Sequence, residues 1–207
     1  MNASAAKRVL NVGSGSKNPS RLHASFSGTE WQEIRLDIDE AADPDIVGSI
    51  TDMRDIVPDK VVDAVWACHI LEHLHAHEAP LALAEFRRIL RPEGFALINC
   101  PDVAAIARLI IDDQFDTPAY MSAAGPVTAL DMLWGHSKSI AGGNHFMAHK
   151  TGFTTKRLGQ LLIDGGFAQA WSFSGGAYDI WAVGLMSQTD QKATRDLLLR
   201  GGVVFPK

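Results

Sequence analysis

The sequence has little of several features that would define a class of protein directly. Its 207 residues include only two cysteines, Cys68 and Cys100, which cannot build a disulfide framework or a paired-cysteine metal knuckle. No apolar run approaches the roughly 18 residues that a membrane-spanning helix needs. Residues 1–8 also contain no apolar signal-peptide core. We therefore expect no membrane partner and a cytoplasmic location.

Basic residues are in the minority as well. Lys and Arg number 19 against 24 Asp and Glu, which gives a formal net charge of −5 at pH 7. Sequence-independent binding to nucleic acid depends on clustered Lys and Arg, so we expect none here. Hydrophobic residues make up 46% of the chain and charged residues 21%, a composition typical of globular proteins. We predict a single domain over residues 1–207.

Short apolar runs alternate with segments of helical periodicity. Strand-length runs that end in loop-forming residues cover 9–12, 33–38, 61–67 and 95–99. Amphipathic spacing predicts helices over 78–90, 102–112, 155–164 and 190–200. Two late apolar runs, 168–173 and 178–185, predict an antiparallel pair of strands. This alternation indicates βαβ units, and hence an α/β, doubly wound, mostly parallel sheet covered on both faces.

One long stretch, residues 113–150, breaks the alternation, and we call it the insertion. It is rich in Gly, Ala and Ser and lacks clear periodicity, although 127–134 could form a helix. A stretch of this length without periodicity is usually a lid or a binding loop. We predict that the insertion covers the carboxyl edge of the sheet. The ends are expected to be a flexible N-terminus, 1–8, and a C-terminal helix and tail, 187–207.

The most informative segment follows the first predicted strand, where Gly13, Ser14 and Gly15 form a glycine-rich turn. Such a turn lets a ligand approach the backbone N–H groups closely. Asp37 lies near the end of the next predicted strand, where a carboxylate can accept hydrogen bonds from ribose hydroxyls. Asn18 stands where a dinucleotide-binding fingerprint has its third glycine, and there is no P-loop. S-adenosylmethionine, a nucleoside without phosphate, fits this combination.

The turn and Asp37, with three further segments, resemble the class I S-adenosylmethionine-dependent methyltransferases of the small-molecule type. The further segments are 47–53, 63–74 and 88–95, and the resemblance extends over 9–110 and 151–185. It implies a seven-stranded, Rossmann-like sheet whose last strand is antiparallel. It also implies S-adenosylmethionine as cofactor and S-adenosylhomocysteine as product.

The resemblance implies a set of cofactor-binding residues at the carboxyl edge of the sheet. In the family, the glycine turn meets the methionine part of the cofactor and the acid after the second strand holds the ribose. Ser49 stands where the family often has an acid that bonds the adenine amino group, so Ser49, Ile50 or Asp52 is expected to supply that contact. The full expected set is Gly13, Ser14, Gly15, Asp37, Ile38, Ser49, Ile50, Asp52 and Cys68.

Methyl transfer from a sulfonium requires alignment of the nucleophile and exclusion of water, and a base only when the acceptor must lose a proton. We take His69 and His145 as candidate catalytic residues. Residues expected to bind the acceptor are Tyr120, Trp134, His136 and His149. The acceptor is expected to be a modest-sized molecule methylated on oxygen, nitrogen or carbon, by a monomer or a homodimer.

Two alternatives remain open. The sequence His69-Ile70-Leu71-Glu72-His73 matches a zinc-hydrolase motif in which two histidines on one helical face bind zinc and the glutamate acts as base. Because the motif begins at the end of a predicted strand, a shared helical face for His69 and His73 is not expected, and we expect no metal. The second alternative is a non-catalytic member of the fold that binds a cofactor or a partner, because Ser49 and Glu93 depart from the family pattern.

Overall fold

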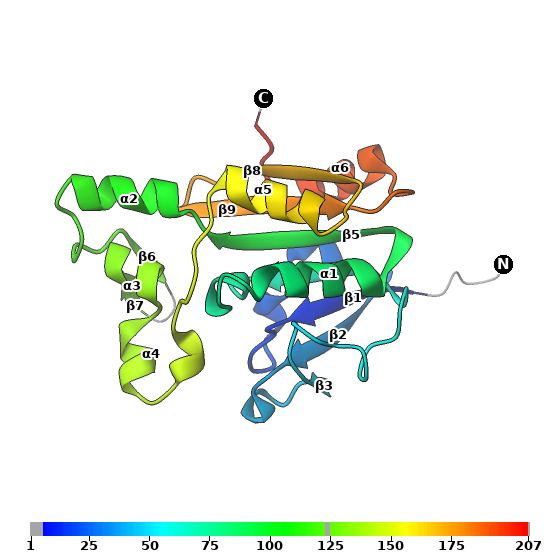
Figure 1. The fold of residues 1–207 in the computed structure, drawn as a ribbon, viewed down its shortest axis with the longest axis horizontal. Coiled ribbons are helices and arrows are strands. Elements are labelled where there is room, and N and C mark those ends of the chain that lie inside the picture. Colours follow the sequence, from blue (N-terminus) through cyan, green and yellow to red (C-terminus); the bar gives the residue numbers. More distant parts are fainter. Residues whose placement is uncertain (1–5, 123–124, 207) are drawn as a thin grey trace.

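The structure is a computed structural model that describes residues 6–122 and 125–206. Its strands, labelled in Figure 1, are β1 (Lys7–Val12), β2 (Trp31–Asp37), β3 (Ile46–Val47), β4 (Val62–Cys68), β5 (Leu90–Pro101), β6 (Tyr120–Ser122), β7 (Gly125–Val127), β8 (Gln169–Ser174) and β9 (Asp179–Leu185). The α-helices are α1 (Ala79–Ile89), α2 (Val103–Ile111), α3 (Ala129–Trp134), α4 (Ser137–Ala141), α5 (Thr155–Asp164) and α6 (Gln191–Arg200). Short 3-10 helices are η1 (Pro19–Arg21), η2 (Ala24–Phe26), η3 (Glu40–Ala42), η4 (Leu71–His73) and η5 (His145–Met147).

Seven strands form one mixed sheet in the order β3-β2-β1-β4-β5-β9-β8. Strands β1 to β5 run parallel, whereas β9 is antiparallel to both of its neighbours, β5 and β8. The predicted fold class, including the antiparallel last strand, is confirmed. In Figure 1 the carboxyl ends of the parallel strands all point toward the side of the molecule that carries the insertion.

Two apolar cores lie on the opposite faces of this sheet. On one face Leu83 and Phe86 of α1 and Leu158 of α5 pack with strand residues and are fully buried. On the other face Leu198 of α6 packs with Phe26 of η2 and with the alternate strand residues. The two faces are covered as predicted, and the central strands β1, β4 and β5 bury both sets of side chains, as parallel sheets do.

The crossovers at one end of the sheet differ from the expected βαβ pattern. Within the described residues no α-helix joins β1 to β2, β2 to β3 or β3 to β4. The 3-10 helices η1 and η2 lie in the first connection and η3 in the second, and the connection from β3 to β4 consists of turns. The segment between β1 and β2 holds Pro19 and Gly28, which do not favour a continuous helix. Aromatic packing covers the sheet there, with Phe26 in edge contact with Trp31 at 4.9 Å between ring centroids.

Some predicted bounds shift in the structure. The helix predicted over 155–164 is observed with those bounds as α5, since Thr154 caps it and Gly165 follows it. The strand predicted over 95–99 is longer, because β5 already pairs with β4 at Leu90, before a bulge. Lys7 already belongs to β1, so the predicted flexible N-terminus reaches too far, and residues 1–5 lie outside the described part of the chain.

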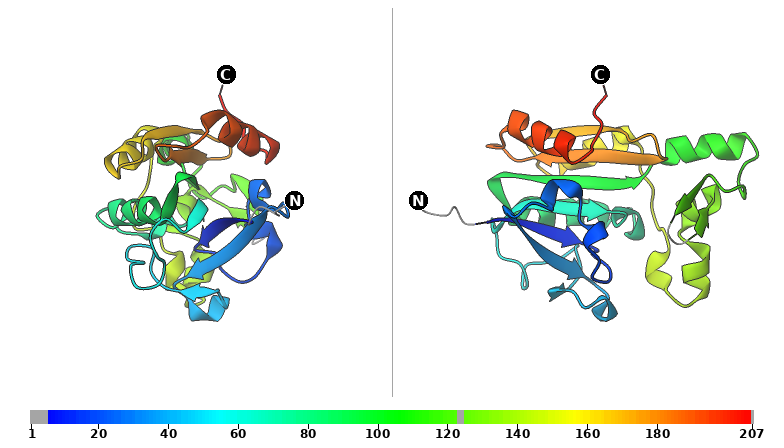
Figure 2. Two further views of the ribbon diagram at one scale, coloured as in Figure 1. Left: turned by 90° about the vertical axis from the view of Figure 1, so that its right-hand side faces the viewer. Right: turned by 180° about the vertical axis from the view of Figure 1, so that it is seen from behind.

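The insertion contains more structure than its sequence indicates. It forms the β6–β7 hairpin, α3, α4 and η5, and α3 falls within the helix predicted over 127–134. A small separate core joins it to α2, in which Ile106 of α2 packs with Val127 and Met132. Figure 2 shows the insertion beside the main body at the carboxyl end of the sheet. In the described part of the chain, no helix is long and apolar enough to cross a membrane.

Candidate cofactor and acceptor site

The glycine turn and Asp37 meet at the carboxyl edge of the sheet. Gly13 has φ +65° and Gly15 φ +58°, conformations that glycine adopts readily and other residues rarely adopt. The backbone N–H of Gly15 donates to Asp37 Oδ2 at 2.7 Å, and that of Asp39 donates to Oδ1 at 3.0 Å. The carboxylate, only 9% exposed, therefore fixes the turn after β1 to the end of β2.

Side chains also approach both glycines closely. A Cβ at Gly13 would lie 2.5 Å from Cδ1 of Ile70, and a Cβ at Gly15 would overlap the guanidinium of Arg21. Arg35, on the same face of β2 as Asp37, donates to the carbonyl of Gly15 at 2.5 Å and to that of Ala42 at 2.9 Å. The turn is thus supported from two sides by arginines, neither of which was predicted as a site residue.

These residues fit an adenosyl cofactor. An ionised carboxylate has about four acceptor positions, and the two backbone N–H groups on Asp37 leave room for two ribose hydroxyls. Ile38, the next residue, has 52% of its surface exposed and offers an apolar face beside the carboxylate. Arg21, next to the turn, can pair with the cofactor's carboxylate. S-adenosylmethionine would supply an activated methyl group on its sulfonium.

The other residues expected to bind the cofactor differ in their contacts and burial. Ser49 Oγ lies 2.8 Å from Thr51 Oγ1, and Ile50 is buried in the core, so only its backbone can face a ligand. The carboxylate of Asp52 instead pairs with Arg54 at 2.6 Å in an exposed ion pair. Cys68 ends β4, and burial raises the pKa of its thiol to about 12.

His69 follows β4 directly and has the unusual value φ +50°. Its ring is half exposed, and Nδ1 lies 3.1 Å from Oε1 of the buried Glu72. Burial opposes the charged form of this ring, but the hydrogen bond and negative charge of Glu72 outweigh it and raise the pKa of His69. A carboxylate only accepts, so Nδ1 carries the proton in this pair and leaves Nε2 as the basic nitrogen.

The acceptor residues expected in the insertion are held in different ways. Tyr120 and Trp134 are partly exposed, and Trp134 makes an edge contact with Phe115 at 5.7 Å. His136 Nδ1 lies 2.7 Å from Ser139 Oγ, and His149 Nδ1 lies 3.0 Å from the carbonyl of Met132.

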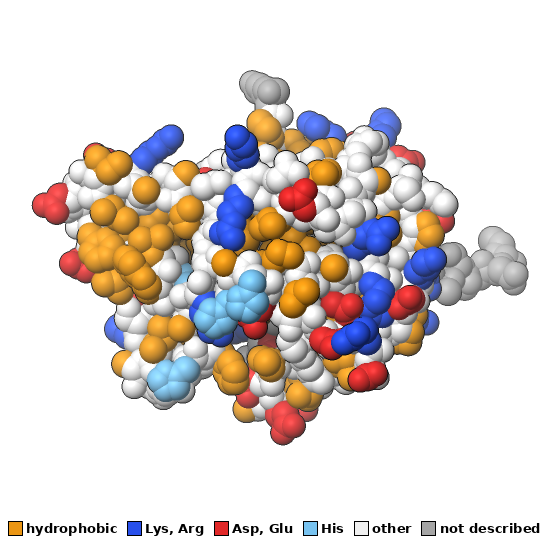
Figure 3. All heavy atoms as spheres, in the orientation of Figure 1, with side chains coloured by type: hydrophobic (Ala, Val, Ile, Leu, Met, Phe, Trp, Pro, Cys, Tyr) orange, Lys and Arg blue, Asp and Glu red, His pale blue; other side chains and the backbone are white. Residues whose placement is uncertain are grey.

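The second candidate catalytic histidine, His145, stands apart from His69. It is exposed on η5, and its backbone bonds stay within the insertion. An apolar surface covers this side of the molecule over β6 and α3 (Figure 3). The exposed apolar residues of α2 and the insertion are Ile110, Ile111, Tyr120, Met121, Trp134 and Phe146.

The zinc-hydrolase motif does not have the geometry that its sequence indicates. His69 lies outside η4, a single 3-10 turn, so His69 and His73 do not share an α-helical face. Glu72 instead contacts His69 through Oε1, and one of its carboxylate oxygens lies within 4.8 Å of a ring nitrogen of both His73 and His149. Reasoning from the sequence had no signal for this arrangement, because His149 comes from the distant end of the insertion.

Comparisons with known proteins agree with the geometry of this edge. A family model described as a methyltransferase domain matches residues 10–98, which include the glycine turn, Asp37 and His69. A comparison with curated proteins found no match.

Solved structures resemble the whole fold. One similar structure is the CMeT domain of a citrinin polyketide synthase, with a TM-score of 0.57 and 12% identity over 89% of this chain and 47% of that one. Another is an S-adenosylmethionine-dependent methyltransferase from Archaeoglobus fulgidus, with a TM-score of 0.56 and 14% identity over 87% of this chain and 86% of that one. A third is 1,6-didemethyltoxoflavin-N1-methyltransferase from Burkholderia thailandensis, with 1,6-didemethyltoxoflavin and S-adenosylhomocysteine bound. Its TM-score is 0.52 and its identity 16%, over 89% of this chain and 72% of that one. The chain spans about half the length of the polyketide synthase chain. At these identities the similarities establish the fold.

Proposed function

We propose that the protein transfers a methyl group from S-adenosylmethionine to an oxygen, nitrogen or carbon of a modest-sized acceptor. The match of residues 10–98 to a methyltransferase-domain family model supports this proposal. The observation that carries this proposal is the hydrogen bond from the backbone N–H of Gly15 to Oδ2 of Asp37, with 2.7 Å between N and Oδ2. This bond brings the glycine turn and a nearly buried carboxylate together at one edge of the sheet, where a ribose and its sulfonium arm can both be held.

In this proposal the chain's own residues divide the task. Asp37 holds the ribose hydroxyls, and Arg21 neutralises the cofactor's carboxylate beside the turn. Ile38 covers the adenine edge, and the Ser49–Thr51 segment supplies polar groups there. Each role rests on the position of the residue at the carboxyl ends of β1 to β3.

His69 is proposed as the residue that takes a proton from the acceptor where the acceptor has one to lose. Glu72 holds Nδ1, so Nε2 is the nitrogen left to accept that proton. The half-exposed ring lies directly after β4, next to the turn that contacts Gly13 through Ile70. This role applies to any acceptor atom that must lose a proton when it is methylated.

The exposed apolar surface of the insertion favours an acceptor that is itself partly apolar or aromatic. Tyr120 and Trp134 each expose about half of their surface on this side, at 41% and 55%. Aromatic faces of this kind bind flat apolar groups by stacking. In this proposal the insertion forms the surface that binds the acceptor, and the sheet edge forms the site that binds the cofactor.

An acceptor screen tests the proposal directly. Purified protein is incubated with S-adenosylmethionine and a panel of phenols, amines and heterocycles, and release of S-adenosylhomocysteine is measured. We expect acceptor-dependent release from at least one partly aromatic compound. Cofactor binding without any release across the panel would instead favour the non-catalytic alternative.

A further inference from the structure

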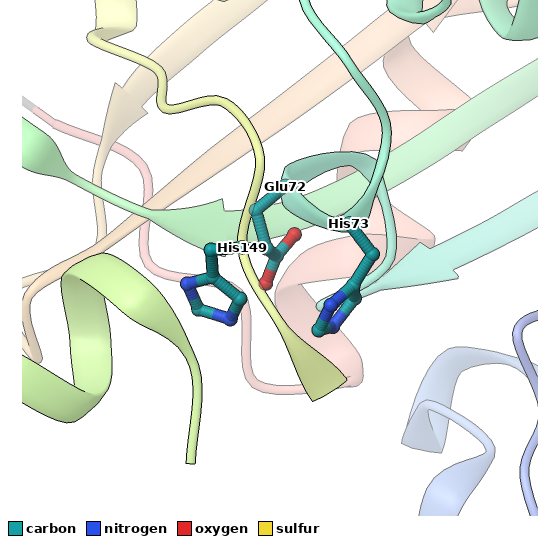
Figure 4. A group of neighbouring side chains, drawn as sticks. All are labelled: Glu72, His73 and His149. Atoms are coloured by element: carbon teal, nitrogen blue, oxygen red, sulfur yellow. The ribbon is translucent and has the colours of Figure 1, made fainter. Parts of the chain in front are cut away.

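We propose that Glu72, His73 and His149 form a binding site for a divalent metal ion of the zinc class, which fastens the end of the insertion to the turn after β4. One ligand atom from each residue lies within 4.8 Å of the other two. Figure 4 shows the carboxylate of Glu72 between the two imidazole rings. The site is separate from the cofactor residues, and the proposal does not depend on methyl transfer.

Both imidazoles are oriented as metal ligands are. His73 Nδ1 lies 3.1 Å from the carbonyl of Ala148, and His149 Nδ1 lies 3.0 Å from the carbonyl of Met132. A carbonyl only accepts, so each Nδ1 carries its proton and each Nε2 keeps a free lone pair. Histidine ligands in proteins usually donate their second nitrogen to a carbonyl or carboxylate in this way.

Glu72 supplies the independent observation. Its side chain is only 1% exposed, and within the described residues its Oε2 has no hydrogen-bond partner. An unpaired oxygen of a buried carboxylate is costly, and burial of a charge is normally offset by a counter-charge or a metal. His69 takes the other oxygen, Oε1, so Oε2 is the atom left for an ion.

The backbone holds the two halves of the site together before any ion binds. The N–H groups of Lys150 and Thr151 both donate to the carbonyl of Glu72, at 2.8 and 3.2 Å. Two histidines and one glutamate are a donor set that zinc takes in open sites, with a fourth position left to water. Tetrahedral bonds of about 2.1 Å place ligand atoms about 3.4 Å apart, so the side chains must draw inward on binding.

Metal titration of the chelator-treated full chain tests the site. Co²⁺ is added as a spectroscopic probe and then displaced with Zn²⁺, while calorimetry records stoichiometry and affinity. We expect equimolar binding with the visible absorption of a tetrahedral Co²⁺ site, and a rise in the melting temperature with Zn²⁺. His149→Ala and His73→Ala should each weaken binding by at least about 100-fold.

Two further variants keep the test decisive. His75 and His77 form an exposed stacked pair, 5.8 Å between centroids, that could bind the same ions weakly. The double variant His75→Ala/His77→Ala should therefore keep the full affinity and spectrum, and Glu72→Gln should lose both. The proposal is overturned if wild type binds no ion, if His149→Ala binds as tightly as wild type, or if binding is lost in the His75/His77 variant.

Discussion

The sheet edge and the insertion meet in space but are built in different ways. At the edge, Leu10, Leu36 and Val65 are fully buried strand residues, and the functional groups follow directly where the strands end. In the insertion, short elements keep large apolar side chains in solvent, with Met121 72% and Phe146 57% exposed. Function at the edge is therefore placed by a rigid scaffold, whereas function in the insertion depends on how it contacts that scaffold.

The contacts that join the two regions are few and specific. His149 reaches both Met132 of the insertion and the Glu72 group after β4. Lys150 and Thr151 then bond the carbonyl of Glu72. Under the proposed function, the edge binds the cofactor and the insertion selects the acceptor.

The largest difference between the sheet edge and the insertion is expected in catalysis. With an acceptor found in the screen that must lose a proton, His69→Ala should lower kcat by about 10²–10⁴-fold, the range for removal of a general base. KM for S-adenosylmethionine should change little, because the cofactor contacts lie on other residues.

His145→Ala is the matched variant in the insertion, since the sequence marked both histidines as candidates. Steady-state kinetics of the two variants decide between them. A larger loss of kcat in His145→Ala than in His69→Ala would contradict the assignment of the proton acceptor to the sheet edge.

Stability should separate the two regions almost as strongly. Phe153 is fully buried in the main core, so Phe153→Ala should lower the free energy of unfolding by about 3–5 kcal/mol. Phe146→Ala removes the same ring from an exposed position in the insertion and should cost within about 0.5 kcal/mol. Denaturant unfolding measures both, and similar costs would show that the insertion is as firmly packed as the core.

A smaller effect is expected for the cofactor itself. Asp37→Ala should weaken S-adenosylhomocysteine binding by about 1–3 kcal/mol, because it removes a charged acceptor from the ribose. Asp45→Ala is its control, since Asp45 also accepts one backbone N–H, from Arg35 at 2.8 Å, but precedes β3 and so lies away from its carboxyl end. Isothermal calorimetry compares the two, and equal losses would count against the ribose assignment.

The smallest effect concerns the loss of folding stability as the pH falls. Burial among aromatic rings lowers the pKa of His23 to about 4. The unfolded chain, with a histidine pKa near its usual 6.5, therefore takes up the proton first. The stability due to neutral His23 is present above about pH 6.5 and is lost as pH falls toward 4. The full shift corresponds to about 2 kcal/mol between pH 7 and 5, and solvent screening of the partly exposed ring reduces the expected loss to about 1 kcal/mol.

The insertion should respond at lower pH. Burial disfavours the charged form of Asp131, yet hydrogen bonds from Ser137 and Thr128 outweigh it and lower its pKa to about 2. The contribution of ionised Asp131 to stability is complete above about pH 4 and is lost below that.

The variant His23→Gln tests the first of these two effects. It should flatten the loss of stability between pH 7 and 5 in thermal unfolding, and an unchanged slope would show that groups other than His23 cause that loss.

The sequence predicted the edge well because its signals are local. The apolar runs and the glycine turn each lie within a few neighbouring residues, and Asp37 is the last residue of its strand, β2. Helix α5 could be predicted to its bounds, since Thr154 and Gly165 mark its two ends.

Other features depend on contacts between distant residues and could not be predicted. Between β1 and β2, aromatic packing around Phe26 and helix α6 cover the sheet in place of a crossover helix, which the local sequence does not reveal. The group of Glu72, His73 and His149 joins the turn after β4 to the end of the insertion. Asp52 was expected at the cofactor, but Arg54, two residues later, pairs with it in solvent.

A crystal structure with S-adenosylhomocysteine tests the central claim most directly. The account predicts that both ribose hydroxyls lie within hydrogen-bond distance of the Asp37 carboxylate, with the sulfur arm over the Gly13–Gly15 turn. A nucleoside bound elsewhere on the chain, or a ribose that leaves Asp37 without contact, would contradict it.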